Sequence, residues 1–161
     1  MNVVGIIAEY NPFHNGHQYQ LEEAKRITGA DKVIIIMSGN FVQRGAPALL
    51  DKYTRTQMAL SCGADLVLEL PLYYSCGSAE YFAKGAISLL HKLGVVDSLC
   101  LGSECGDIAL LTQVAELLAN PSPALTASIK NYLKEGNTFP KARALALADS
   151  IAGDPSSAIS D

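Results

Sequence analysis

Two short apolar runs, separated by an amphipathic segment, constrain the fold more than any other feature of this 161-residue chain. Val3–Ala8 and Lys32–Met37 are rich in Val and Ile, which is typical of strands buried on both faces of a parallel sheet. Between them, His17–Ile27 carries apolar side chains at helical spacing, and Gly29 predicts the end of that helix. The opening residues therefore predict a β-α-β unit with a right-handed crossover.

The same alternation continues along the chain after a glycine-containing loop, Ser38–Pro47. The pattern predicts a helix at 52–61, a strand at 66–70, a helix at 78–93 and a strand at 98–101. Strands that alternate with helices indicate an α/β fold with a doubly wound, Rossmann-like parallel sheet.

The character of the chain changes after Gly106, where no further strand is predicted. Helices are expected at 108–119, 124–135 and 139–151, with Asp107 as an N-terminal cap of the first. We therefore expect a nucleotide-binding α/β domain over 1–106, a helical extension of the same domain over 107–151, and a disordered tail over 152–161.

Composition excludes several classes of protein. The formal charge is −4, and so acidic a chain is not expected to bind nucleic acid non-specifically. The cysteines lack the spacing of a zinc site or of a secreted disulfide framework, so reduced thiols in the cytoplasm are expected, without a metal held by protein side chains. No apolar stretch reaches the roughly 18 residues of a membrane span, so no membrane partner is expected.

The segment His14-Asn15-Gly16-His17 is the main candidate site because it joins the first strand to the first helix. Ligands of open α/β sheets bind at this edge, and a helix N-terminus attracts phosphate. Gly16 permits close approach of the backbone, and both histidines can donate hydrogen bonds to a reacting phosphate. A histidine pair at this spacing can also cap a helix, bind a metal or arise by chance.

Other candidates have structural alternatives. Glu9 can orient a ligand or a histidine, or be a solvated strand end, and Asn11 can simply form a turn. Arg44, Lys52 and Arg55 can contact the phosphates of a nucleic acid or a polyphosphate, or be an ordinary solvated helix start.

Longer motifs add a family resemblance. The strand followed by NPFHNGH is similar to the first signature of the nucleotidylyltransferase superfamily. Together with MSGNFVQRGAPALLDKYTR, GADLVLELP, SAEYFAKGAISLL and LGSECGD, it resembles the bacterial tRNA(Met) cytidine acetate ligases from Met1 to about Gly106.

The resemblance implies an enzyme that uses ATP, with Mg²⁺, to activate acetate as acetyl-adenylate. The acetyl group then passes to the N4 amine of the wobble cytidine in elongator tRNA(Met). His14 and His17 would be catalytic. The implied ATP-binding residues are Ile7, Ala8, Glu9, Tyr10, Asn11, Pro12, Phe13, His14, Asn15, Gly16, His17, Gln18, Tyr19, Gln20 and Gly102.

The chain departs from the family pattern in its second half. The resembling enzymes are much longer and carry a Pro-Asn-Asn segment and a later Ser-Ser-x-x-Ile-Arg-like signature, which Pro155–Ile159 matches only superficially. We therefore expect a truncated chain with an exposed sheet edge that favours self-association. The alternative functions are an adenylyltransferase for a small phosphorylated cofactor precursor and an inactive nucleotide-binding fragment.

Overall fold

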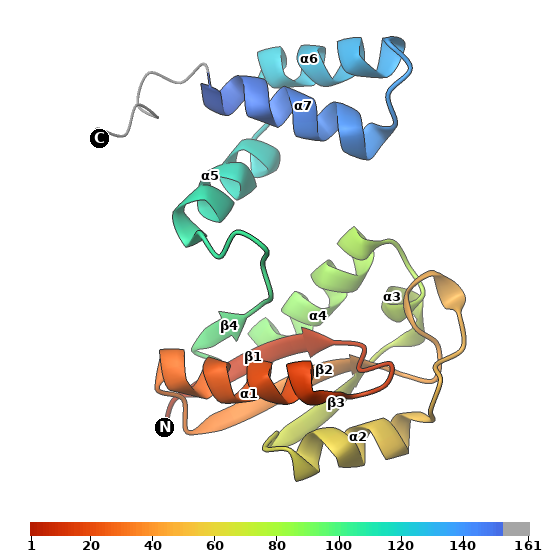
Figure 1. The fold of residues 1–161 in the computed structure, drawn as a ribbon, viewed down its shortest axis with the longest axis vertical. Coiled ribbons are helices and arrows are strands. Elements are labelled where there is room, and N and C mark those ends of the chain that lie inside the picture. Colours follow the sequence, from red (N-terminus) through yellow and green to blue (C-terminus); the bar gives the residue numbers. More distant parts are fainter. Residues whose placement is uncertain (153–161) are drawn as a thin grey trace. The chain divides into compact units, whose positions relative to one another are not determined.

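The computed structural model describes residues 1–152 and divides the chain into two compact units, Met1–Gly102 and Ser103–Asp161 (Figure 1). The first unit contains β1 (Val3–Ala8), α1 (Asn15–Thr28), β2 (Lys32–Ser38), the 3₁₀ turn η1 (Gln43–Gly45), α2 (Lys52–Ser61), β3 (Leu66–Leu70), α3 (Leu72–Ser75), α4 (Ala79–Leu93) and β4 (Ser98–Cys100). The second unit contains α5 (Ile108–Ala119), α6 (Pro123–Lys134) and α7 (Phe139–Ala152).

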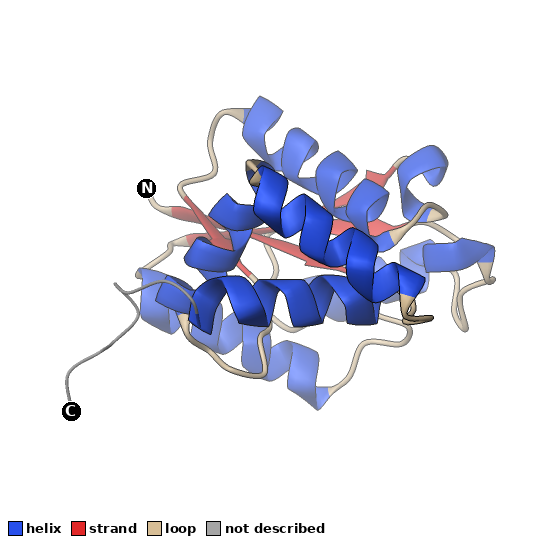
Figure 2. Cartoon of the chain, turned by 90° about the horizontal axis from the view of Figure 1, so that it is seen from above, coloured by secondary structure: helices blue, strands red, loops and turns tan. Residues whose placement is uncertain are grey.

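The four strands form one parallel sheet in the order β3-β2-β1-β4. Helices α1 and α2 cover one face and α4 covers the other, so strands and helices alternate as in a doubly wound fold (Figure 2). Ala8 pairs with Met37, which in turn pairs with Glu69. The carboxyl ends of three neighbouring strands therefore meet at one edge, which confirms the predicted fold class.

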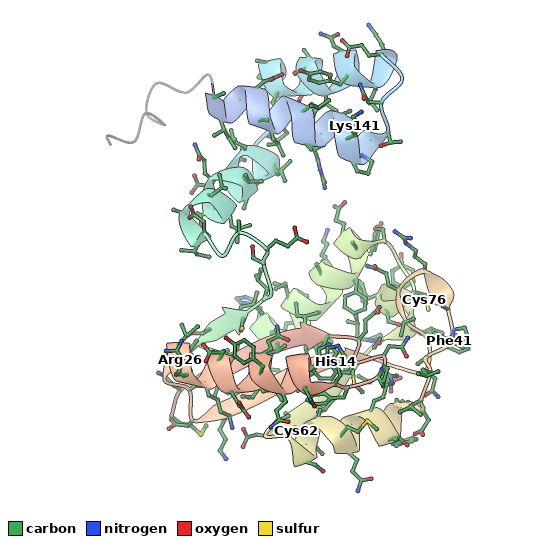
Figure 3. All side chains as sticks on the ribbon, in the orientation of Figure 1. His14, Arg26, Phe41, Cys62, Cys76 and Lys141 are labelled. Atoms are coloured by element: carbon green, nitrogen blue, oxygen red, sulfur yellow. The ribbon has the colours of Figure 1, made fainter. Side chains whose placement is uncertain are left out.

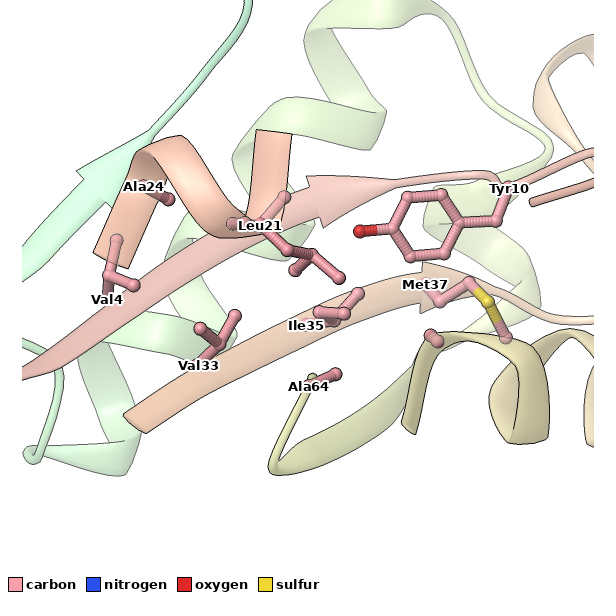
Figure 4. Close-up of a cluster of buried hydrophobic side chains, with 10 residues drawn as sticks. Val4, Tyr10, Leu21, Ala24, Val33, Ile35, Met37 and Ala64 are labelled. Atoms are coloured by element: carbon pink, nitrogen blue, oxygen red, sulfur yellow. The ribbon is translucent and has the colours of Figure 1, made fainter. Parts of the chain in front are cut away.

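Burial on both faces explains why β1 and β2 read as continuous apolar runs. Ile35 faces Leu21 of α1, in the cluster drawn in Figure 4, whereas Ile36 faces Phe82 of α4. Both isoleucines are fully buried. Burying a side chain of this size contributes about 1.5–3 kcal/mol, so the central strand is a main source of stability.

Most predicted boundaries agree with the structure to within a few residues, and the differences have local causes. Helix α1 begins at Asn15 rather than at His17, because His14 acts as its N-cap. It ends at Gly29, whose left-handed φ of 63° fits glycine. The short elements η1 and α3 were not predicted, since neither is long enough to show helical periodicity.

The second unit is helical throughout its described part. Asp107 caps α5 by accepting hydrogen bonds from the N–H groups of Ala109 and Leu110, at 2.9 and 3.0 Å, as predicted. Helices α6 and α7 pack through Leu125, Ala146 and Leu147. Apart from Ala152, which ends α7, the tail expected to be disordered lies outside the described residues.

No helix within residues 1–152 combines the length and the apolar character that a bilayer crossing requires.

Candidate functional site

His14 and His17 lie together at the start of α1, beyond the carboxyl end of β1. Figure 3 labels His14 there. Their rings stack with centroids 3.7 Å apart and planes 25° from parallel. The N–H of Gly16 donates to Nδ1 of His14 at 3.1 Å, and the N–H of His14 donates to Nδ1 of His17 at 3.2 Å. The two imidazoles thus replace the Ser/Thr and Glu/Gln side chains of an ordinary capping box.

These hydrogen bonds fix the tautomer of both rings. Because Nδ1 of each histidine accepts a backbone N–H, the proton of the neutral imidazole must be on Nε2. Burial, and then the charge of His14, lowers the pKa of His17 and so favours its neutral form. The site therefore presents two Nε2–H donors at the positive end of a helix dipole.

Gly16 makes room for this arrangement. A Cβ at Gly16 would lie 3.0 Å from Cε1 and 3.2 Å from Nδ1 of His14, closer than the ring tolerates without moving. The sequence assigned Gly16 to close approach of a phosphate. In the structure the space that it leaves is occupied by the His14 ring.

Aromatic side chains support the histidine pair from the protein side. The ring of Tyr10 lies 4.8 Å from that of Phe13 and 4.7 Å from that of His17. Tyr10 is buried, with a left-handed φ of 48°, and its hydroxyl points toward Leu21 (Figure 4). Tyr10 is therefore part of the core that positions His17.

Glu9 and Asn11 tie the site to the loop that follows β2. The carboxylate of Glu9 accepts the N–H of Gln43 at 2.7 Å, and the side-chain oxygen of Asn11 accepts the N–H of Leu49 at 2.6 Å. The peptide bond between Asn11 and Pro12 is cis. The structure thus gives Glu9 and Asn11 a loop-anchoring role, which was not among the predicted alternatives.

Arg55 is a correction to the sequence prediction. Its side chain is fully buried, which contradicts a role in contacting tRNA or polyphosphate. Nε donates to the carbonyl of Leu50 at 3.0 Å and Nη1 to that of Glu9 at 2.5 Å. Nη2 donates to the carbonyls of Ser38, at 3.1 Å, and Gly39. Arg55 therefore ties the ends of β1 and β2 to the loop before α2.

The other two predicted basic contacts remain accessible. Arg44 is exposed at a left-handed turn, with φ of 66°. Lys52 begins α2, and its ammonium donates to the carboxylate of Glu69 at 2.5 Å. Lys52 is thus already paired within the protein, whereas Arg44 faces solvent.

A pocket of about 260 Å³ lies beside this ion pair. Its apolar lining comes from Met37, near the carboxyl end of β2, and from Val67 in β3. Its polar lining comes from Ser38, Glu69 and the first two turns of α2, including Lys52, Tyr53 and Thr56. The pocket lies on the α1/α2 face of the sheet, because Met37 and Val67 pack into the same cluster as those helices.

The remaining predicted ATP-site residues lie on β1, on α1 and after β4. Ile7 and Ala8 are the half-buried end of β1, and Asn15 is the exposed first residue of α1. On α1, Gln18 donates to Glu22 at 3.0 Å, Tyr19 is exposed, and Gln20 is half-buried. Gly102 lies two residues beyond the pairing of Cys100 with Ile6, at the same sheet edge.

Within residues 1–152, no three His, Cys, Asp or Glu side chains gather into a group that could hold a metal ion. The third histidine, His91, lies in the last turn of α4. The expectation of no protein-held metal stays a prediction.

Sequence reasoning missed the structural role of Arg55 and the pocket around Glu69. The missed signal for Arg55 was its position. It falls four residues after the Asp51 cap and four before the buried Ala59, so helical spacing places it on the inner face of α2. For Ser38 the signal was a hydroxyl that directly continues a fully apolar strand.

Known proteins resemble the chain throughout its described part. A sequence model of the HIGH Nucleotidyl Transferase family matches residues 1–159. Two relatives of this chain are named tRNA(Met) cytidine acetate ligase. The protein of Clostridium perfringens (strain SM101 / Type A) is 58% identical over 91% of this chain, and that of Alkaliphilus metalliredigens is 54% identical over 92%. The chain spans 37% and 35% of their lengths.

A solved structure agrees with these relatives. The crystal structure of Thermotoga maritima TmcAL bound with alpha-thio ATP superposes with a TM-score of 0.89 at 43% identity. The match covers 94% of this chain and 37% of that one. Family model, relatives and fold agree, and the chain belongs to the HIGH nucleotidyl transferase family.

Proposed function

We propose that this chain is the nucleotide-binding part of a ligase that acetylates the wobble cytidine of elongator tRNA(Met). An oxygen of acetate attacks the α-phosphorus of ATP, forming acetyl-adenylate and releasing pyrophosphate. The N4 amine of cytidine then attacks the acetyl carbonyl, giving N4-acetylcytidine and AMP, with loss of a proton from the amine. The relatives named tRNA(Met) cytidine acetate ligase support this assignment.

The observation that carries the proposal is the pair of stacked imidazoles whose Nε2–H groups are available to a ligand. Negative charge builds on the non-bridging α-phosphate oxygens as acetate attacks. Donors that are already oriented stabilise this charge without reorganising. The positive end of the α1 dipole acts in the same direction. Neither histidine forms a covalent bond in this scheme.

The proposed ATP site comprises residues 7–20 and Gly102, which lie at the carboxyl edge of the sheet. Mg²⁺ would enter with the triphosphate, bound mainly by phosphate oxygens, as is usual for this ion. Exposed Arg44 is the candidate contact for polyphosphate or tRNA. We further propose a cytoplasmic location and, where the outer edge of β4 is not covered, self-association through it.

The test replaces each histidine by asparagine in the complete reading frame that contains this chain. Asn is a favourable N-cap whose side-chain oxygen can accept the same backbone N–H, but it lacks the Nε2–H donor. We expect the melting temperature of His14→Asn and His17→Asn to stay close to wild type. Acetate-dependent exchange between ATP and pyrophosphate should fall about 10²–10³-fold, the usual effect of losing one such donor.

The matched control is Gln18→Ala, which removes an exposed α1 side chain that is bonded to Glu22. Gln18→Ala should change the acetate-dependent exchange between ATP and pyrophosphate little. The proposed function is refuted if the wild-type protein makes no acetylcytidine from ATP, acetate and tRNA(Met). Stimulation of pyrophosphate release by a small phosphorylated acceptor, and not by acetate, would instead indicate the cofactor adenylyltransferase.

A further inference from the structure

The pocket beside α2 lies on the same face and edge of the sheet as the histidine pair. Ala8, Met37 and Glu69 are in register across β1, β2 and β3. Neighbouring strands are about 4.8 Å apart, so Glu69 lies about 10 Å across the sheet from the end of β1. A group held at Glu69 therefore lies at the same edge of the sheet as one activated at the start of α1, two strand spacings from the end of β1.

The charges in the pocket indicate which kind of ligand fits. Lys52 and Glu69 form an ion pair, so their charges cancel and a small anion gains little from the site. A neutral ligand that carries a donor beside acceptors can contact both partners of the pair. Met37 and Val67 provide an apolar wall for a flat ring, and the exposed ring of Tyr53 is available for stacking at the pocket mouth.

We propose that this pocket binds the cytosine base that receives the acetyl group, an inference that rests on the proposed function. Glu69 accepts a hydrogen bond from the N4 amine, which is the usual carboxylate contact of cytosine. The ammonium of Lys52 and the hydroxyl of Thr56 donate to N3 and O2. Enzymes that modify a base commonly extrude it into such a pocket and read this edge.

The geometry also explains selection against uracil. Uracil presents an oxygen where cytosine has its amine and an N–H where cytosine has N3. Glu69 would face an acceptor and Lys52 would face a donor, which leaves both charged groups badly matched. The neighbouring backbone keeps Glu69 in place, because Gly39 lies so close to its carboxylate that a side chain there would collide with it.

The experiment separates the two half-reactions in the complete protein. Acetate-dependent exchange between ATP and pyrophosphate, without tRNA, reports activation. Acetyl transfer is measured with tRNA(Met) transcript, and affinity with transcripts bearing C or U at the wobble position. The variant is Glu69→Gln. Glu23→Gln is the matched control, because Glu23 is a carboxylate on α1 that pairs only with exposed Arg26 in the described chain.

We expect Glu69→Gln to lower acetyl transfer at least tenfold more than it lowers exchange. Wild type should prefer the C transcript by about tenfold, within the range of a good base contact, and Glu69→Gln should lose most of that preference because an amide can donate to O4 of uracil. Thermal unfolding checks that each variant is folded.

The pocket assignment is overturned if Glu69→Gln keeps the wild-type preference for C, or if exchange and transfer fall equally. An absence of acetate-dependent exchange and of acetylcytidine in the wild type would refute the proposed function itself. That result is read from the wild type alone, so the two failures are distinguishable.

Discussion

Replacing Arg55 by methionine should destabilise the protein far more than replacing any exposed arginine. The substitution keeps an unbranched side chain of similar length but removes every N–H donor from a fully buried site. The carbonyls of Glu9, Ser38, Gly39 and Leu50 would lose their guanidinium partner.

The magnitude follows from these contacts. Each lost hydrogen bond to a buried carbonyl costs about 1 kcal/mol, so the four together predict about 4 kcal/mol. Burial lowers the pKa of Arg55, and Asp51 and other carboxylates act in the opposite direction. Burying the charge therefore costs free energy, and removing the charge offsets part of the stability that the lost hydrogen bonds provided. Even reduced in this way, a loss that begins at about 4 kcal/mol is a large fraction of the 5–15 kcal/mol that stabilises a typical domain.

Urea unfolding of the complete protein measures this loss. Arg55→Lys should fall between wild type and Arg55→Met, because one ammonium cannot reach all the carbonyls that the planar guanidinium spans. Arg26→Met is the matched control. Its guanidinium is exposed and pairs with Glu23, so the change in unfolding free energy should be small beside that of Arg55→Met. A free energy of unfolding for Arg55→Met within about 1 kcal/mol of wild type would refute the reasoning.

Three further predictions concern the site. Gly16→Ala should change the unfolding free energy by less than about 1 kcal/mol. It should lower the exchange between ATP and pyrophosphate about tenfold at saturating ATP, because the new Cβ displaces the His14 ring. Burial lowers the pKa of His17, so the native state binds fewer protons than the unfolded state between that lowered pKa and about 6.5. Stability should therefore rise with pH through this window and be lost as pH falls. The urea midpoint of His17→Asn should rise less over the same pH range than that of wild type. Ser38→Ala should leave the urea midpoint unchanged or raise it, since the lost hydroxyl has no partner among the described residues.

The fold was predictable because its main signals are local. Val3–Ala8 and Lys32–Ser38 are apolar on both faces, and such runs occur in few other contexts than a covered parallel sheet. Helix α2 and strand β3 lie at the predicted residues, since Asp51 caps the first and a glycine-containing turn precedes the second. The position of His14 and His17 at a strand-to-helix junction followed from the same local pattern.

What the sequence could not supply was the partner of each polar side chain. Arg55 looked like one of three cations near a helix start, and only the fold reveals that it alone points inward. Glu9 and Asn11 likewise have backbone partners more than thirty residues away, at Gln43 and Leu49. Contacts at such separations depend on how the loop after β2 folds back, which no local periodicity encodes.

The helix-capping and phosphate-binding interpretations of the histidine pair turn out to describe the same hydrogen bonds. A Ser or Asn cap would satisfy the N–H of Gly16 equally well, so capping alone gives no reason for histidine at position 14. The imidazole differs because accepting at Nδ1 forces its proton onto Nε2, on the opposite side of the ring. Stacking of His14 on His17 then orients both donors. Helix initiation thus fixes the protonation that the proposed chemistry requires, and a variant that caps as well but cannot donate separates the two roles.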